Sequence, residues 1–243
     1  MSIPLKIFVR QELNMRKGKM APQSAHAAMK LFLEAMSKND QGMKLSGRQF
    51  EEFSAFMENP VVEVVPVTGE DGMLALIDHS KPYAVITDSG RTEFAGVPTV
   101  TCGAQGIFSE SPCQELEVPL YGKEIRAKQL FVFSKLYPLK KYDAAAMGAL
   151  VCLKSIYERM VVSADNAFLP LAPGSPMSEW VFGAFAKIGL GVPSDVDLEV
   201  IKDSLMTHGH PVTELVMGEN KVIAVGPAFP SDIDPLTGEL RLI

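Results

Sequence analysis

Near the start of the chain, polar and basic side chains gather in the run KGKMAPQSAHA (17–27). Gln23 and His26 are three residues apart, so they share one face if the run is helical. A glycine-containing turn that leads into a helix offers free backbone N–H groups and the positive end of the helix dipole, which favour an anion. Lys17 and Lys19 would add positive charge. The run therefore predicts an anion site, but it lacks the GxxxxGK[ST] pattern of a P-loop.

A second polar cluster is the turn TDSGRT (87–92), followed by Thr101. It stands where a predicted strand ends, and such loops often carry function. Gly90 permits a sharp turn. Taken alone, Asp88 could simply cap that turn through a side-chain hydrogen bond to the backbone. The joint occurrence of the two clusters favours one site built from both.

The hydrophobic pattern of the first half predicts the elements that must hold these side chains. Pro22 is expected in the first turn of the helix that carries Gln23 and His26, where a missing N–H costs nothing. Strand 61–67 is a continuous apolar run, typical of a strand buried on both faces. The full set is strands at 5–11, 61–67, 83–87 and 97–103 with helices at 22–36, 47–57 and 72–79.

The second half repeats this order. Asp143 is the expected N-cap of its long helix, and a loop rich in Pro and Gly is expected at 162–176. Residues from Phe8 align with those from Phe131 without a gap. The expected elements are strands at 129–135, 186–192, 211–217 and 221–227 and helices at 143–160, 179–185 and 195–209.

The repeated β-α-α-β-α-β-β order predicts an α/β fold of two similar three-layer α/β/α units. Each unit would hold a small, mixed four-stranded sheet flanked by helices, and the two would form a pseudo-dimer. The expected division is a first copy at 1–104, a linker at 105–127 and a second copy at 128–243. A single domain with a long insertion between Cys102 and Ala224 is the rival division. Duplication is preferred because the insertion would itself contain a second strand–turn–helix start.

Charge and cysteine usage limit the class of protein. The net charge is −6, yet residues 1–30 hold six basic side chains against Glu12 alone, a balance of +5 that leaves −11 for the rest. A basic patch on an acidic body suits one anionic partner rather than every phosphate backbone. Three cysteines with no metal-binding spacing favour free thiols in a reducing compartment. With no signal peptide and no apolar run of membrane length, a cytoplasmic protein without membrane contact is expected.

The run VRQELNMRKGKMAPQSAHA (9–27) closely resembles the opening of the type 2 peptidyl-tRNA hydrolases, and DSGRT (88–92) followed by TVTC (99–102) resembles that family's second motif. The resemblance covers about residues 4–104. Residues 224–243 resemble the family's C-terminal tail. The second copy has Tyr142, Ala146 and Ala149 where the first has Lys19, Gln23 and His26, so it is expected to be catalytically empty.

The resemblance implies hydrolysis of the ester that joins a peptidyl group to tRNA, without metal or other cofactor. Asp88 would orient or activate a water molecule, Lys19 would stabilise the oxyanion or a nearby phosphate, and hydroxyls would bond water or substrate. The expected catalytic residues are Lys19, Asp88, Thr92 and Thr101, and the expected substrate-binding residues are Arg16, Lys17, Gln23, His26 and Arg91.

Two alternatives remain open. The first is an inactive module that binds tRNA or another anion on the same fold, which the departures Arg16 and Pro22 within the motif would favour. The second is a hydrolase of another small acyl or amide substrate, because fold and motif do not fix the substrate.

Overall fold

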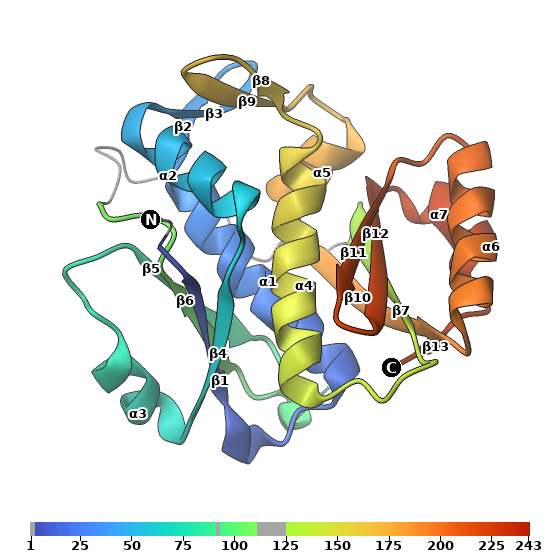
Figure 1. The fold of residues 1–243 in the computed structure, drawn as a ribbon, viewed down its shortest axis with the longest axis horizontal. Helices are drawn as coiled ribbons and strands as arrows, with labels where there is room; N and C mark the ends of the chain where they lie inside the picture. Colours follow the sequence, from blue (N-terminus) through green and yellow to red (C-terminus); the bar gives the residue numbers. More distant parts are fainter. Residues whose placement is uncertain (1–2, 91–92, 111–124) are drawn as a thin grey trace.

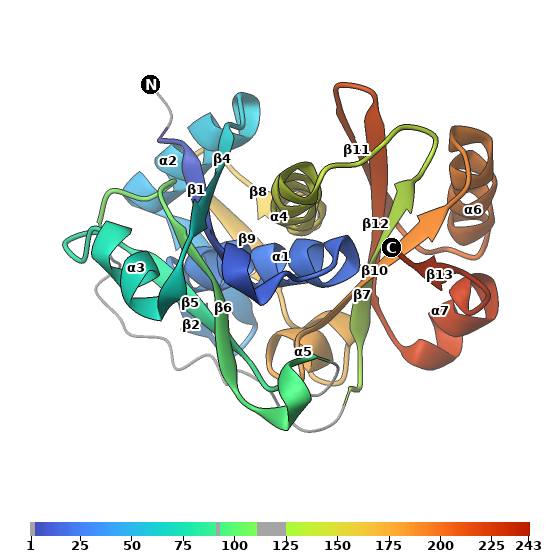
Figure 2. The same cartoon turned by 90° about the horizontal axis from the view of Figure 1, so that it is seen from below.

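The computed structural model describes residues 3–90, 93–110 and 125–243. Two helices lie side by side at the centre of the molecule, with one sheet on either side of them and further helices outside each sheet (Figure 1, Figure 2). The central helices are α1 (Lys17–Glu34) from the first half and α4 (Lys141–Tyr157) from the second. The chain thus forms a mixed α/β structure in which helices flank each large sheet, as the sequence predicts.

The first large sheet has the strand order β4-β1-β6-β5. β1 pairs in parallel with β4 and antiparallel with β6, which in turn pairs antiparallel with β5. Helix α3 packs on the outer face, where Met73 and Ile77 join Phe8 and Val67 in a small apolar cluster. The bounds are β1 Leu5–Arg10, β4 Val62–Val67, α3 Gly69–Leu76, β5 Tyr83–Asp88 and β6 Thr99–Gln105.

The second large sheet has the order β11-β12-β7-β10-β13. Read from β10 to β11, four of its strands repeat the order and directions of the first sheet. β7 pairs in parallel with β10 and antiparallel with β12, and β12 pairs antiparallel with β11. The fifth strand, β13, and helix α7 were not predicted. The bounds are β7 Lys128–Ser134, β10 Ala186–Val192, α6 Asp195–Thr207, β11 Val212–Met217, β12 Asn220–Ala228, α7 Pro230–Thr237 and β13 Arg241–Leu242.

A third sheet, which the sequence did not predict, joins the two halves. It has the order β2-β3-β9-β8, and β3 of the first half pairs antiparallel with β9 of the second. The expected loop at 162–176 is therefore wrong in its first part. Helices α2 and α5 follow these hairpins. The bounds are β2 Ser37–Asn39, β3 Gly42–Ser46, α2 Gly47–Glu58, β8 Val161–Val162, β9 Asn166–Pro170 and α5 Pro176–Val181.

Three local predictions were wrong. Helix α1 begins at Lys17 rather than near Pro22, so Pro22 lies inside the helix and Lys19 belongs to its first turn. Asp143 is not the N-cap of α4, since that position is held by Lys140. β4 is an edge strand with mostly half-exposed residues, because its hydrophobic run is covered on one side only.

The two halves share one hydrophobic core. Helix α1 is buried on nearly all sides, and so is α4. The Phe53 ring of the first half packs at a tilt against that of Phe32 and meets the ring of Tyr157 from the second half edge-on, with 5.4 Å between the last two centroids. Because this core draws side chains from both halves, each half stabilises the other.

The small side chains on α1 and α4 allow the helices to approach closely. A Cβ on Gly148 would lie 2.6 Å from the carbonyl oxygen of Ala21. We expect Gly148→Val to lower the free energy of unfolding by about 1–3 kcal/mol, because the helices must move apart. Urea unfolding measures this. Gly72→Ala, at a helical glycine with open space around it, is the control and should be neutral or stabilising. An unchanged midpoint for Gly148→Val would contradict the close packing.

Candidate functional site

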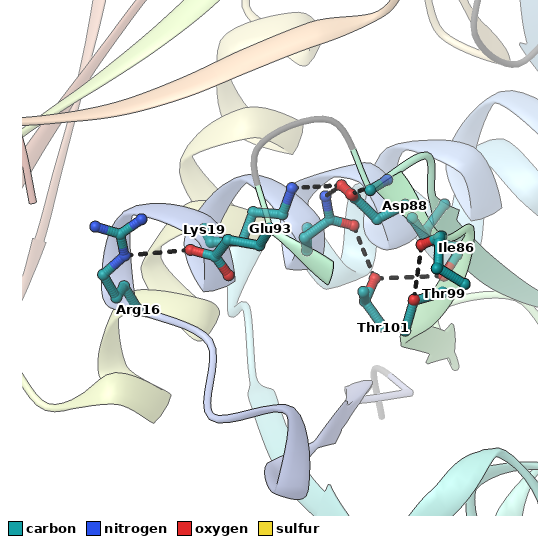
Figure 3. Close-up of polar contacts among 10 residues, drawn as sticks. Arg16, Lys19, Ile86, Asp88, Glu93, Thr99 and Thr101 are labelled. Atoms are coloured by element: carbon teal, nitrogen blue, oxygen red, sulfur yellow. Dashed lines mark hydrogen bonds and ion pairs between the residues drawn. The ribbon is translucent and has the colours of Figure 1, made fainter. Parts of the chain in front are cut away.

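An ion pair joins the two polar clusters that the sequence singled out. Nζ of Lys19, in the first turn of α1, lies 2.6 Å from Oδ2 of Asp88 at the end of β5 (Figure 3). The two side chains are only 15% and 11% exposed, so water screens their attraction weakly. The lysine ammonium also lies 5.7 Å from the centroid of the Phe94 ring. The fold therefore brings together two charges that are 69 positions apart in the sequence.

A buried amide and a buried hydroxyl support the carboxylate. Nε2 of Gln23 donates to Oδ2 of Asp88 at 2.7 Å, and Oγ1 of Thr101 donates to Oε1 of Gln23 at 2.8 Å. Thr101 is fully buried, so its hydroxyl acts on Gln23 rather than on the solvent side of the site. This chain of hydrogen bonds from β6 through α1 to β5 fixes the position of Asp88.

Backbone geometry holds the other carboxylate oxygen. The N–H of Gly90 donates to Oδ1 of Asp88 at 2.8 Å, which is the turn-capping bond considered from the sequence. Gly90 has a φ of +77°, and a Cβ there would lie 2.6 Å from backbone atoms of Val97. Glycine is required at this position for both reasons. Asp88 therefore caps its turn and pairs with Lys19 at the same time.

A cavity of about 420 Å³ opens beside this network. Its wall from the first half includes Lys19, Gln23, His26 and Asp88, and its wall from the second half includes Lys187. The remaining lining residues are Arg16, Gly18, Pro22, Ser89, Glu93, Ile125, Ala184, Ala186, Ile188, Leu242 and Ile243. A mostly apolar concave site with a few converging polar groups is typical of a small-molecule or chain-end binding site.

Two nitrogen bases meet at the back of the cavity. Nζ of Lys187 lies 3.2 Å from Nδ1 of His26. Burial, followed by the positive charges of Lys187 and Lys19, holds the pKa of His26 well below its ordinary value. Burial also lowers the pKa of Lys187 from 10.5 to about 7. His26 is therefore a neutral imidazole at neutral pH.

The backbone anion site predicted at the start of α1 is used differently. The N–H of Gly18 donates to the main-chain oxygen of Ile243 at 3.0 Å. A Cβ on Gly18 would lie 2.4 Å from that same oxygen. The tail of the second half therefore lies against the helix N-terminus, and the charged side chains of the cavity remain as the groups that can meet an anion.

The other predicted residues have separate positions. Arg16 lines the cavity mouth, and its Nε lies 3.2 Å from Oε1 of Glu93 (Figure 3). Lys17 is half-buried and does not line the cavity. Arg91 and Thr92 lie outside the described residues.

Thr101 supplies a test of the buried network. In Thr101→Val the oxygen of Gln23 loses its donor while the shape of the side chain is kept. We expect the free energy of unfolding to fall by about 1–3 kcal/mol, because a buried acceptor is left unpaired. Thr99→Val, whose hydroxyl donates to the carbonyl of Val97 near the surface, should change it by about 0.5 kcal/mol or less. Equal midpoints for both variants in urea would show that the network contributes nothing to stability.

Thiols and metal ligands do not add to this site within the part of the chain that the structure describes. Burial raises the pKa of Cys102 to about 12 and that of Cys152 to about 11, so both remain protonated and poorly nucleophilic. Cys113 falls outside the described ranges. No group of three or more His, Cys, Asp or Glu side chains among the described residues could hold a metal ion. Within the same ranges, every helix is too short or too polar to cross a bilayer.

Comparison with known proteins agrees with this geometry. The family model described as peptidyl-tRNA hydrolase PTH2 matches residues 3–116. A peptidyl-tRNA hydrolase of Metallosphaera sedula is 36% identical over 104 residues, which are 41% of this chain and 82% of the relative. A peptidyl-tRNA hydrolase of Haloquadratum walsbyi is 30% identical over 104 residues, which are 43% of this chain and 85% of the relative.

Human mitochondrial peptidyl-tRNA hydrolase 2 is 33% identical over 93 residues, or 37% of this chain and 47% of the human protein. The fold and site together define an α/β protein with a mostly apolar cavity, into which a few polar groups converge, at the start of a central helix. The chain belongs to the peptidyl-tRNA hydrolase PTH2 family.

The sequence interpretation missed the contribution of the second half to the cavity. Lys187 and Ile243 line it, although both lie far along the sequence from the residues that match the family model. The available signal was the strand AKIGLGV (186–192), in which one lysine stands among apolar residues and glycines. A lone lysine in such a run is commonly assigned to a solvent-facing position, whereas Lys187 is only 7% exposed.

Proposed function

We propose that this chain hydrolyses the ester bond between the peptidyl group and the 3′ end of tRNA in peptidyl-tRNA. The observation that carries the proposal is the Lys19–Asp88 pair, 2.6 Å apart at the wall of the cavity, in a member of the PTH2 family. The relatives from Metallosphaera sedula and Haloquadratum walsbyi are themselves named for that activity. Ester hydrolysis needs a positioned water and a cation near the developing oxyanion; the carboxylate of Asp88 can accept a hydrogen bond from such a water, and Lys19 supplies the cation.

Asp88 is proposed to orient the attacking water. Its two oxygens are held by Gly90, Gln23 and Lys19, so it keeps one position. Lys19 is proposed to stabilise the negative charge that develops on the ester oxygen. Thr101 acts through Gln23, as a positioning residue.

The remaining roles are proposals that follow the family resemblance. His26 and Arg16 line the cavity and are assigned to binding of the tRNA 3′ end, together with Lys17 and Arg91. Thr92 is assigned to a hydrogen bond with water or substrate. No cofactor is invoked in this scheme.

The second half is proposed to be a duplicated copy without a site of its own, which makes the chain a monomeric pseudo-dimer. The matching strand orders of the two large sheets support this. At the positions of Lys19, Gln23 and His26 it carries Tyr142, Ala146 and Ala149. These residues cannot build a charged site. Because the substrate is a tRNA, the proposed location is the cytoplasm.

The test is release of free tRNA from a bulk mixture of N-blocked aminoacyl-tRNA. Cleavage that needs the tRNA body supports the proposal. Cleavage of a small N-blocked amino-acid ester at an equal rate would instead favour a hydrolase of other acyl substrates. Salt-sensitive tRNA binding by a folded protein that cleaves neither substrate would favour the anion-binding module.

A further inference from the structure

Lys187 is a buried amine that the proposed mechanism leaves without a role. It lies at the start of β10 in the second half, lines the cavity and contacts His26. Its Nζ lies 3.2 Å from the Phe185 ring centroid, 4.4 Å from that of Trp180 and 3.4 Å from the carbonyl oxygen of Phe185. Within the described ranges, no carboxylate forms an ion pair with it. A buried cation usually has such a partner.

The charged and titratable groups that face Lys187 do not neutralise it. Helix α1 presents His26, and beyond it Lys19. Helix α4 presents Cys152, which is itself protonated. Burial therefore lowers the pKa of Lys187 to about 7. An anion that entered the cavity would favour the charged form of this amine and gain a charged contact.

The geometry of the cavity separates two positive positions. Lys19 pairs with Asp88 on the wall from the first half, whereas Lys187 contacts His26 from the wall of the second half. Among the described lining residues from the second half, Lys187 has the one charged side chain, and the others are alanine, leucine and isoleucine. The second half thus contributes an apolar wall with a single cation in it.

We propose that Lys187, supplied by the second half, binds a phosphate oxygen of the phosphodiester next to the scissile ester. This deepens the proposed function and rests on it. Lys19 and Asp88 act at the ester, and Lys187 holds the adjoining nucleotide linkage. The catalytically empty copy is then part of the site, which gives a reason for the second half to be retained.

The test uses two esters in the full chain. One is an N-acetylaminoacyl ester of the trinucleotide CCA, which carries phosphodiesters, and the other is the same ester of adenosine, which carries none. In Lys187→Met we expect KM for the CCA ester at pH 6.5 to rise by about tenfold to a hundredfold. KM for the adenosine ester and kcat for both should stay within about twofold.

The pH dependence of the wild-type protein gives an independent readout. As the pH rises from 6.5 to 8.5 Lys187 loses its proton, so KM for the CCA ester should rise while KM for the adenosine ester should not. Lys38→Met is the matched control, since the ammonium of Lys38 also lies over an aromatic ring, that of Phe182, but does not line this cavity. It should leave both KM values unchanged.

The outcomes separate the two proposals. Equal losses on both esters would place Lys187 at the ester itself and overturn the phosphate assignment, and unchanged values would leave it structural. If the wild type cleaves neither ester, the proposed function fails. Binding of the free CCA trinucleotide then decides the role of Lys187, and equal affinity in wild type and Lys187→Met would overturn it.

Discussion

Asp88→Asn should cut the turnover of N-blocked aminoacyl-tRNA by about a hundredfold or more. The substitution removes the negative charge beside Lys19 and replaces one acceptor oxygen by an amide nitrogen. That nitrogen would face a donor, because Gly90 and Gln23 each donate to one carboxylate oxygen. The attacking water would lose its acceptor, and Lys19 would lose the partner that fixes its ammonium. Lys19→Ala should produce a loss of similar size, since one charged stabiliser of the oxyanion typically contributes about 3–4 kcal/mol.

Single-turnover release of tRNA measures the chemical step in these variants. Asp78→Asn is the matched control for the carboxylate, because Asp78 is exposed in a turn with Ser80 and does not line the cavity. Lys140→Ala is the control for the lysine and removes a basic side chain just before the corresponding helix of the second half. Both controls should keep wild-type turnover. Wild-type turnover in Asp88→Asn and Lys19→Ala would overturn the assignment of the site.

Lys187→Met should make the protein more stable and change how stability depends on pH. The pKa of Lys187 is about 7 in the folded protein against 10.5 as its ordinary value. A depressed lysine pKa means that the unfolded chain binds more protons between these values, so stability rises with pH across that window. The full difference between these two pKa values corresponds to a cost of about 5 kcal/mol in the free energy of unfolding at pH values below 7, where Lys187 is charged in the folded protein. Methionine avoids that penalty and keeps a similar length.

The measurement is urea unfolding at pH 6.5 and at pH 8.5. Between these two pH values the free energy of unfolding of the wild type should rise by about 2 kcal/mol because of Lys187. Lys187→Met should lack that rise. Groups that titrate in both proteins contribute equally to both changes in the free energy of unfolding, so their contributions cancel when wild type and variant are compared. Lys38→Met should keep the wild-type dependence, because Lys38 is exposed. Equal pH dependence in wild type and Lys187→Met would show that the pKa of Lys187 is not lowered in the folded protein.

A variant that is more stable and yet binds substrate less well would separate function from structure at Lys187. Replacing a residue that is kept for packing lowers the stability of the protein, whereas replacing a residue that is kept for binding often raises it. The two Lys187 experiments therefore have opposite expected signs. This contrast does not depend on the absolute size of either effect.

The sequence by itself determined many of the local elements of this protein and which residues of the first half form its site. Strand and helix periods placed β1, β5 and β6 within a few residues and located α1 but not its start, because apolar spacing reflects which face is buried. Lys19, Gln23, Asp88 and Thr101 were singled out in two short motifs, and the structure brings all four together. The repeat of elements was also visible, since it needs only the order of short segments.

Tertiary structure alone decided how the halves meet. The joint sheet of β3 and β9 and the close contact at Gly148 depend on pairing between segments more than 100 residues apart. No local pattern encodes such a pairing, because a strand edge or a helix face can accept many partners. The same holds for Lys187, whose sequence neighbours predict an ordinary strand. Only the packing of β10 against α1 buries its amine beside His26 and makes the second half a wall of the site.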